Sequence, residues 1–424
     1  HLVSQVEVGH GCPTSMTGAV LPALREQPDL AAVWEPRVRT RSYDQRLIEP
    51  SLKSGNLLGM GLTEKQGGSD VRANTSTAVP VNGGPGGEYR LTGHKWFTSA
   101  PMCDAFLILA QAPGGISCFL TPRILPDGSR NSLFLMRLKD KLGNRSNASS
   151  ELEYVDAAGW LVGEEGRGIN VIMKMVNATR VDVTNWSASL MRQAVTQAAG
   201  YVVQREAFGA PLIDKPLMQN VLADLELETE VATMMTMRLA GAFERAPIDD
   251  HESHFLRLSS AVAKYWLSKR STPVVREALE CLGGAGFVEE SILPRLYREA
   301  PLNAIWEGAG NVIALDVLRA LQRSPEAGEA FVTELSLAAG GDVVFDRELA
   351  ALKRQIATPV DEADARRLVE QLALCWGASL CLRHEPEIAD AYIRSRLDGD
   401  WGSEFGTLSS NVRFDRLARR ACAV

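Results

Sequence analysis

The sequence predicts an α+β protein of several domains, on three observations. The chain has 424 residues, 45% of them hydrophobic and 23% charged, which is enough for two to four domains with a large core. From about residue 56, short apolar runs alternate with Gly, Pro and Asn turns, a pattern typical of a small antiparallel barrel or sandwich. After Gly168, apolar residues recur every three to four positions, which indicates a helical bundle. We therefore expect four parts, at residues 1–55, 56–163, 164–323 and 324–424.

The first part is expected to consist of short helices. His1–Leu24 predicts a turn followed by a helix of small residues, and residues 43–53 predict another short helix. The segment starts without the cap expected of a domain's first helix. We therefore expect it to be the remnant of a longer N-terminal helical domain.

Seven runs in the second part predict strands, because they are short, apolar and bounded by turn residues. They are Leu57–Leu62, Thr75–Val79, Tyr89–Leu91, Ala105–Leu109, Ile116–Leu120, Leu133–Leu138 and Leu152–Val155. The string N-G-G-P-G-G at Asn82–Gly87 predicts a hairpin tip. No Gly-Lys-Ser/Thr follows it, so it is not a phosphate-binding P-loop.

The third part predicts four helices, which together suggest a four-helix bundle. They are expected at residues 168–207, 216–245, 253–282 and 309–323, with Pro211, Pro216, Pro247 and Pro273 near the breaks. The fourth part shows no strand pattern and predicts a helical extension. Its helices are expected at residues 329–337, 347–356, 361–382 and 387–396, with a last one ending near Arg420.

The composition argues against several classes of protein. The net charge of −7 is unfavourable for a dedicated nucleic-acid binder. Seven cysteines without a C-x-x-C pair, and six histidines without H-E-x-x-H, argue against disulfide and zinc frameworks. No apolar run is long enough for a membrane span, and no signal-peptide pattern opens the chain. We expect a cytoplasmic protein with reduced core thiols and no metal site.

One carboxylate lies in an unusual setting, in the string A-P-L-N-A-I-W-E-G-A-G-N at Ala300–Asn311. Glu307 follows an apolar run that ends in Trp306 and precedes the flexible turn Gly308–Gly310. Burial beside an indole raises a carboxyl pKa, so Glu307 is a candidate base near neutral pH, and the glycines allow close approach to a flat cofactor. The alternative is a carboxylate that stabilises the N-terminus of the next helix.

Four other strings carry more polar or small residues than their elements need. G-M-G-L-T-E-K-Q-G-G-S at Gly59–Ser69 offers hydroxyls and backbone N–H groups, which suit a polar ring edge or a phosphate. G-H-K-W-F-T-S at Gly93–Ser99 places aromatics beside hydroxyls. R-E-A-F-G at Arg205–Gly209 and E-C-L-G-G-A-G-F at Glu280–Phe287 each end a predicted helix. Ordinary turns and helix caps explain each string when it is taken alone.

These strings occur together and in one order, and with them the chain resembles the acyl-CoA dehydrogenase flavoprotein family. Two further matching strings are R-L-Y-R-E-A and, at Lys139–Ser149, K-D-K-L-G-N-R-S-N-A-S, which is most similar to the AidB-like subgroup of adaptive-response proteins for alkylation stress. The resemblance implies an N-terminal helical domain, a middle β-domain and a C-terminal four-helix bundle, with FAD between the last two. It also implies a homotetramer in which one subunit touches the FAD of another.

The resemblance implies a role for each matching position. Glu307 matches the catalytic base, which removes the α-proton of an acyl-CoA while the β-hydrogen leaves as hydride to the flavin. Thr179 and Arg180 match positions near the base and the substrate. The residues implied to contact FAD are Met60, Leu62, Thr63, Gly68, Ser69, Phe97, Ser99, Arg205, Phe208, Glu280, Gly283, Gly284, Trp306, Gly308 and Asn311.

Three functions follow. The first is an FAD-dependent acyl-CoA dehydrogenase, whose electron acceptor the sequence leaves open. The second is a flavin-containing protein that binds double-stranded DNA and limits alkylation damage, with Arg319, Arg413, Arg416 and Arg420 as candidate contacts. The last three are expected to share one face of a helix. Residues 321–424, however, contain 13 Lys and Arg but 17 Asp and Glu, so this segment is negative overall and repels phosphates. Arginines on one face of a surface helix are also commonly solvated or ion-paired. The third is a flavin oxidase or monooxygenase acting on a small molecule.

Overall fold

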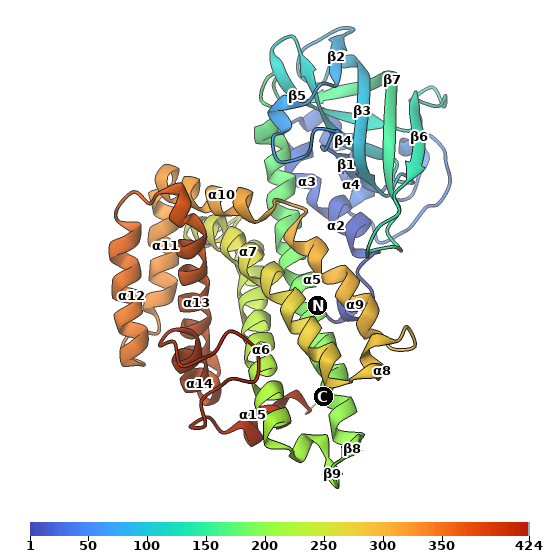
Figure 1. Ribbon diagram of the computed structural model, residues 1–424. Coiled ribbons are helices and arrows are strands. Elements are labelled where there is room, and N and C mark those ends of the chain that lie inside the picture. Colours follow the sequence, from blue (N-terminus) through green and yellow to red (C-terminus); the bar gives the residue numbers. More distant parts are fainter. Residues whose placement is uncertain (423–424) are drawn as a thin grey trace. The chain divides into compact units, whose positions relative to one another are not determined.

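The computed structural model describes residues 1–422, and their chain forms two compact units (Figure 1). One unit is Glu7–Thr179, here called the β unit. The other, here called the helical unit, is His1–Val6 together with the chain from Arg180 onward. The boundary lies within α5 (Gly168–Gln204), which contributes residues to both. No helix among residues 1–422 is long and apolar enough to cross a membrane.

The β unit contains a seven-stranded sheet that closes on itself. The strand order is β1-β4-β2-β3-β7-β5, β6 is added beside β7, and the pairing of β5 with β4 completes the ring. The predicted β-domain is therefore confirmed, although β1 and β2 run parallel to β4. The strands are β1 (Leu58–Gly61), β2 (Thr77–Pro80), β3 (Glu88–Ser99), β4 (Ala105–Ala112), β5 (Gly115–Pro122), β6 (Leu133–Leu138) and β7 (Ser149–Val162).

Short helices precede the sheet in the β unit. They are α2 (Gly11–Ala19), α3 (Leu21–Leu24) and α4 (Pro28–Val38), and α1 (Leu2–Val6) belongs to the helical unit. The Thr17 hydroxyl of α2 hydrogen-bonds the backbone of Leu58, so this helix is tied directly to β1. The helix expected at residues 43–53 is wrong except for one 3₁₀ turn at Pro50–Leu52, and α4 was not predicted.

The helical unit is built on three long helices: α5, α6 (Pro216–Arg245) and α7 (Asp250–Cys281). Pro273 lies inside α7 and does not break it. A two-stranded hairpin, β8 (Glu206–Ala207) and β9 (Ala210–Pro211), joins α5 to α6. The remaining helices are α8 (Gly284–Phe287), α9 (Leu293–Glu299), α10 (Gly310–Arg323), α11 (Pro325–Ser336), α12 (Val343–Ile356), α13 (Ala365–His384), α14 (Pro386–Arg396) and α15 (Phe414–Ala421).

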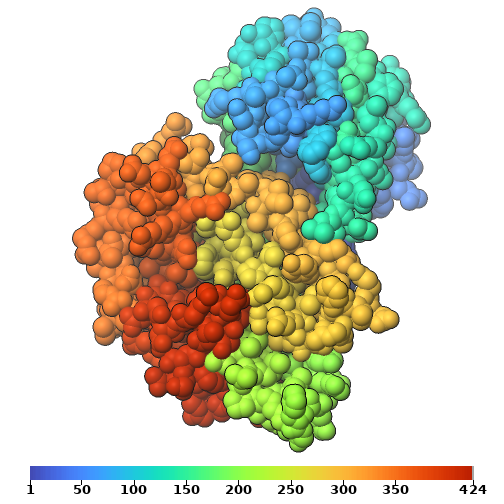
Figure 2. Space-filling model, in the orientation of Figure 1, coloured from blue at the N-terminus to red at the C-terminus, as the bar shows by residue number. Residues whose placement is uncertain are grey.

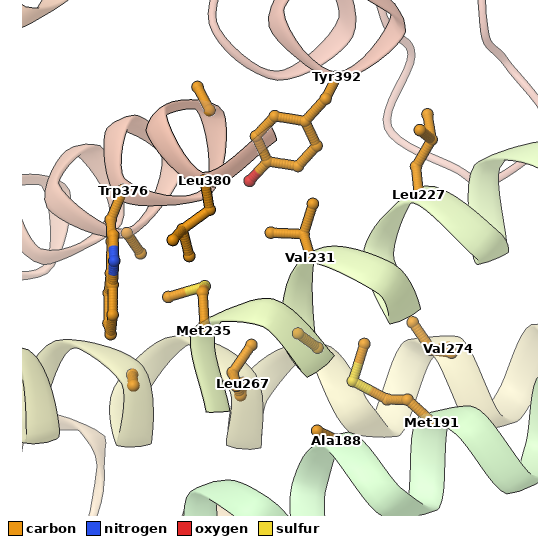
Figure 3. Packing of buried hydrophobic residues seen from close by; sticks show 14 of the residues in the cluster. Ala188, Met191, Leu227, Val231, Met235, Leu267, Val274, Trp376, Leu380 and Tyr392 are labelled. Carbon is orange, nitrogen blue, oxygen red and sulfur yellow. The ribbon is translucent and has the colours of Figure 1, made fainter. Parts of the chain in front are cut away.

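The C-terminal helices share the core of the bundle. Trp376 and Leu380 of α13 and Tyr392 of α14 lie against Val231 and Met235 of α6 (Figure 3). On the surface, the orange and red C-terminal residues adjoin the yellow residues of α7 (Figure 2). Residues after 323 therefore form one hydrophobic core with the bundle.

A buried ionic network also joins these helices. The Arg396 guanidinium of α14 binds Asp224 and, at 3.0 Å, Glu228, and both carboxylates lie on α6. Arg270 of α7 binds the same Glu228 at 3.1 Å, and the Trp401 indole donates to Asp224 at 2.8 Å. Because each buried charge has an opposite charge beside it, the network stabilises the packing of α14 on α6 and α7.

Candidate active site

The candidate base lies on a strained turn between two helical segments. A 3₁₀ turn (Ala300–Ala304) precedes it, and α10 begins at Gly310. Glu307 has φ +55° and Gly308 has φ +110°, both in the left-handed region. For a residue other than glycine this conformation costs about 1–3 kcal/mol, so the surrounding structure must hold it.

Two buried cations hold consecutive carbonyl groups of this turn. Arg180 of α5 donates from Nε to the Glu307 carbonyl at 3.1 Å, and Lys264 of α7 donates from Nζ to the Gly308 carbonyl at 2.5 Å. Asp316 of α10 fixes Arg180 through an ion pair of 2.7 Å and also binds Arg257 at 2.8 Å. The turn is therefore held from two helices, and a third helix fixes one of the two cations.

An aromatic pair lines the turn on its N-terminal side. The Trp306 ring lies 5.5 Å from that of Trp186 in α5, and its indole donates to the Asn303 side chain at 3.2 Å. The sequence predicts an apolar neighbour for Glu307, which is Trp306. It does not reveal the two positive charges at the turn, Arg180 and Lys264. Thr179 is buried and its hydroxyl donates to the Val176 carbonyl at 3.0 Å. Arg180 binds the Glu307 carbonyl of the turn. The roles of Thr179 and Arg180 toward a substrate stay predictions.

In the β unit, the predicted polar loop is held by a buried ion pair. Lys95 is 0% exposed and donates to Glu64 at 2.7 Å and to the Leu109 carbonyl at 2.7 Å. Glu64 also accepts bonds from the backbone N–H and hydroxyl of Thr75 and of Ser76. Burial raises the pKa of Glu64, but the bonds from Lys95, Ser76 and Thr75 outweigh it and lower that pKa to about 2.

This pair brings two of the predicted strings together. β3 bulges between Lys95 and Thr98, so Trp96 and Phe97 leave the ladder with β7. The Trp96 N–H then donates to the Thr63 carbonyl at 2.8 Å, and Phe97 forms a bridge with Thr63. Trp96 and Phe97 are about a third exposed, at 36% and 37%. The loop after β1 and the end of β3 therefore form one surface of aromatic rings and hydroxyls.

The remaining β-unit candidates lie along this surface. Leu62 and Met60 are half-buried, and Ser69 is exposed. A Cβ at Gly68 would lie 2.5 Å from the Thr63 hydroxyl, so a side chain does not fit there. Ser99 accepts a bond from the Asn147 amide at 3.3 Å. The hydroxyls can donate hydrogen bonds to a flavin edge, the close-packed glycine lets the backbone approach it, and the exposed rings offer a flat apolar face, so these residues fit that group.

A second group of candidates does not converge with Glu307 in this chain. Arg205, Phe208, Glu280, Gly283 and Gly284 are all exposed. They lie at the β8–β9 hairpin and at α8, toward one end of the helical unit, whereas the turn before α10 lies toward the other (Figure 1). Asn311, on the first turn of α10, is exposed and accepts a bond from Arg366 at 2.8 Å.

The arginines proposed for DNA do not form the expected face. α15 begins at Phe414, so Arg413 precedes the helix, and it binds Asp415 at 3.2 Å. Arg420 is held by three carboxylates, those of Glu230, Glu385 and Glu387 at 2.6–3.3 Å. The shared arginine face is therefore wrong. Within residues 1–422, Arg319 and Arg416 are exposed and make no ion pair.

Sequence reasoning missed the residues that hold the two loops: Glu64, Lys95 and Lys264. Glu64 and Lys95 lie within polar strings of the sequence, where nothing indicates that they are buried together. Lys264 had a visible signal, because it is a lone charge in the apolar run A-V-A-K-Y-W-L and shares a face with Ala261 and Ser268, which are buried. Among residues 1–422 no cluster of potential metal ligands occurs.

Comparisons with known proteins agree with the fold. The family models of the acyl-CoA dehydrogenase middle and C-terminal domains match residues 59–157 and 166–322, and the AidB N-terminal domain model matches residues 1–45. AidB of Escherichia coli (strain K12) is 45% identical over 420 residues, which are 99% of this chain and 76% of AidB. Acyl-CoA dehydrogenase family member 11 of Caenorhabditis elegans is 32% identical, over 83% of this chain and 58% of that protein.

Solved structures show the same fold. Caenorhabditis elegans ACDH-11, solved in complex with C11-CoA, has a TM-score of 0.79 at 28% identity, over 97% of this chain and 71% of its own. An acyl-CoA dehydrogenase from Bacillus anthracis complexed with FAD has a TM-score of 0.68 at 19% identity, over 88% of this chain and 76% of its own. The chain belongs to the acyl-CoA dehydrogenase family. Within that family it is AidB-like.

Proposed function

We propose that this protein is an FAD-dependent oxidoreductase of the acyl-CoA dehydrogenase type, with Glu307 as the base. One observation carries the proposal: a carboxylate residue is kept at φ +55° by hydrogen bonds from two buried cations, Arg180 and Lys264. Strain that is maintained in this way is typical of functional residues. The chain belongs to the acyl-CoA dehydrogenase family, and Glu307 matches the position of that family's catalytic base.

FAD is the cofactor that we propose, and groups of the β unit support it. Thr63 and Ser99 offer hydroxyls, Phe97 offers an aromatic face, and Gly68 leaves room for close approach of the backbone. When bound, FAD supplies the acceptor for the hydride that leaves the β-carbon. Leu62, Met60 and Ser69 complete the proposed contacts.

The proposed substrate is an acyl-CoA. ACDH-11 of Caenorhabditis elegans was solved with C11-CoA, which supports an acyl thioester as the substrate class. The thioester acidifies the α-C–H, and the Glu307 carboxylate accepts that proton. A well-placed base contributes about 10²–10⁴-fold in rate. Arg180 and Lys264 bind the carbonyl groups of the turn, so the turn can keep the carboxylate in one direction.

Titration of the flavin-loaded protein with acyl-CoAs of short, long and branched chains tests this function. We expect loss of the oxidised flavin absorbance with at least one of them, and slower loss by about 10²–10⁴-fold in Glu307→Gln with unchanged flavin content. A flavin-loaded protein that is bleached by no acyl-CoA in anaerobic titration contradicts the proposal. Hydroxylated product formed only with oxygen would favour the monooxygenase alternative instead.

A homotetramer is the assembly that we propose. The Phe208 ring is 95% exposed, and its backbone has φ +53° at the tip of the β8–β9 hairpin. Phe287, at the end of α8, is 79% exposed. Two large exposed rings are typical of an interface, and the resemblance places Arg205 and Phe208 on the FAD of a neighbouring subunit.

Binding of double-stranded DNA, a cytoplasmic location and the electron acceptor stay predictions or open questions. For DNA, Arg319 and Arg416 are the two candidates without an ion pair within residues 1–422. A shift of duplex DNA in a gel that weakens as the salt concentration rises would support DNA binding. The absence of a shift at low salt would refute this prediction.

A further inference from the structure

A lysine lies in the core of the helical unit, directly beneath the turn that carries the candidate base. Lys264 is 1% exposed and stands between buried neighbours, Ala263 and Tyr265, in the middle of α7. A buried ammonium is destabilising unless a hydrogen bond or an opposite charge compensates for it. The Lys264 ammonium donates a hydrogen bond to the Gly308 carbonyl, 2.5 Å from Nζ, and this bond compensates for part of the cost of its burial.

The charges around Lys264 come from four elements. Arg180 approaches from α5, Glu307 from the turn and Lys269 from α7 itself. Asp316 of α10 is already bound by two guanidinium groups, those of Arg180 and Arg257. Burial lowers the pKa of Lys264 to about 7, the positive charges of Arg180 and Lys269 add to this, and Glu307 opposes it.

We propose that Lys264 is a positioning residue for proton abstraction: its ammonium holds the Gly308 carbonyl, and this bond fixes the left-handed backbone that aims the Glu307 carboxylate. The inference rests on the proposed function of Glu307. Lys264 touches neither the reacting atoms nor the cofactor in this scheme, and acts only through the turn.

The two cations at the turn are not equivalent. Arg180 keeps its charge at every accessible pH, because a guanidinium does not lose its proton in proteins. Lys264 loses its charge as the pH rises through its pKa, and both the charge-assisted bond to Gly308 and the attraction to Glu307 weaken. The turn is therefore held by two charges below that pH and by one above it.

A pH dependence follows, with a definite sign. The base must be ionised, which sets an acid limb, and Lys264 must be protonated, which sets an alkaline limb in the rate of flavin reduction. Lys264→Arg keeps a permanent charge and should move or abolish the alkaline limb. Lys264→Met should slow flavin reduction about 10²-fold across the whole range, since small misplacements of a reacting group have effects of that size.

The experiment measures flavin reduction by acyl-CoA in a stopped-flow instrument from acid to alkaline pH, for wild type, Lys264→Met, Lys264→Arg and Lys269→Met. Lys269 is the matched control, because it lies on the same helix and, within residues 1–422, donates no hydrogen bond to the turn. We expect its rate below the alkaline limb to equal that of wild type, and the limb itself to move to higher pH, because Lys269→Met removes one positive charge that lowers the pKa of Lys264. An unchanged rate in Lys264→Met, or a wild-type alkaline limb in Lys264→Arg, overturns the proposal.

Amide hydrogen exchange of the peptide covering residues 305–311 gives a second readout that needs no turnover. We expect exchange about 10-fold faster in Lys264→Met and unchanged in Lys269→Met, and equal exchange in both overturns the proposal. If no acyl-CoA reduces the flavin of the wild-type protein, the proposed function fails. The exchange data still decide whether Lys264 holds the turn. Should Lys264→Met not fold, the alkaline limb of Lys264→Arg decides the question.

Discussion

The buried pair of Lys95 and Glu64 allows a quantitative test of how the loop after β1 (residues 62–69, here called the flavin loop because we propose that it contacts FAD) is held. Lys95 is 0% exposed and Glu64 2%, and the two side chains are 2.7 Å apart. Replacing Lys95 by Met removes the cation but leaves a carboxylate in the core, still bonded to Thr75 and Ser76. Breaking a buried pair in this way costs about 3–5 kcal/mol, so we expect Lys95→Met to destabilise the β unit by that amount.

The pKa of Glu64 gives an independent magnitude. It is lowered from 4.5 to about 2, and each pKa unit corresponds to about 1.4 kcal/mol, so ionised Glu64 contributes about 3 kcal/mol at neutral pH. Because this folded-state pKa lies below the unfolded one, the contribution is complete above pH 4.5 and is lost as the pH falls toward 2. Burial lowers the pKa of Lys95, which offsets part of the gain.

Urea unfolding of wild type, Lys95→Met, Glu64→Gln and the double variant measures both quantities. We expect each single change to be strongly destabilising and the double variant to lose less than their sum, because neither group is then left unpaired. The exposed pair of Arg298 and Glu289 is the control, and Arg298→Ala should change stability by less than about 1 kcal/mol. A cost below about 1 kcal/mol for Lys95→Met, or additive single effects, would refute the reasoning.

Three further predictions concern other parts of the chain. Gly68→Ala places a methyl group against the Thr63 hydroxyl, so we expect reduced flavin occupancy, measured by the ratio of flavin to protein absorbance, whereas full occupancy would contradict the fit. Arg396→Met leaves the buried carboxylate of Asp224 without an opposite charge and Glu228 with Arg270 alone, and we expect a loss of about 3–5 kcal/mol in thermal unfolding, which a near-neutral result would disprove. Phe208→Ser should weaken subunit association by at least 10-fold in sedimentation, with monomer stability unchanged, and an unaltered assembly would exclude Phe208 from the interface.

Regular elements were predictable where local signals agree. α6 occupies the predicted residues 216–245, because Pro216 starts the helix and one face is continuously apolar. The helix expected at residues 43–53 fails for a local reason: Asp44 binds the Arg46 side chain and the backbone of Ser54, so extended chain replaces helix. α4 has a helix-start signal in the sequence, Pro28 followed by Asp29.

The candidate site was predictable only in part. The string around Glu307 indicates a buried carboxylate beside an indole and a turn that contains glycines; the turn is present, and Glu307 is half-buried in it. What holds the turn is remote in sequence, since Arg180 precedes Glu307 by 127 positions. The same holds for Arg420, whose partner Glu230 is 190 positions away, so an arginine that looks free along the chain is ion-paired in the fold. Pairings at such separations leave no periodic signal in one sequence.

The two loops share a physical problem and solve it in the same way. Each turns away from regular structure, so its carbonyl groups lack the partners that a helix or sheet supplies. Apolar packing cannot replace those partners, but a buried lysine can. Lys264 binds the Gly308 carbonyl of the base turn, and Lys95 binds the Leu109 carbonyl of β4, just beyond Ile108, where the pairing of β1 with β4 ends and the loop begins. Lys95 is paired with Glu64, which has no part in the proposed reaction. Lys264 instead interacts with the charge of Glu307, which the proposed reaction needs. The bond from Lys264 to the Gly308 carbonyl, which shapes the turn, therefore weakens when Lys264 loses its proton.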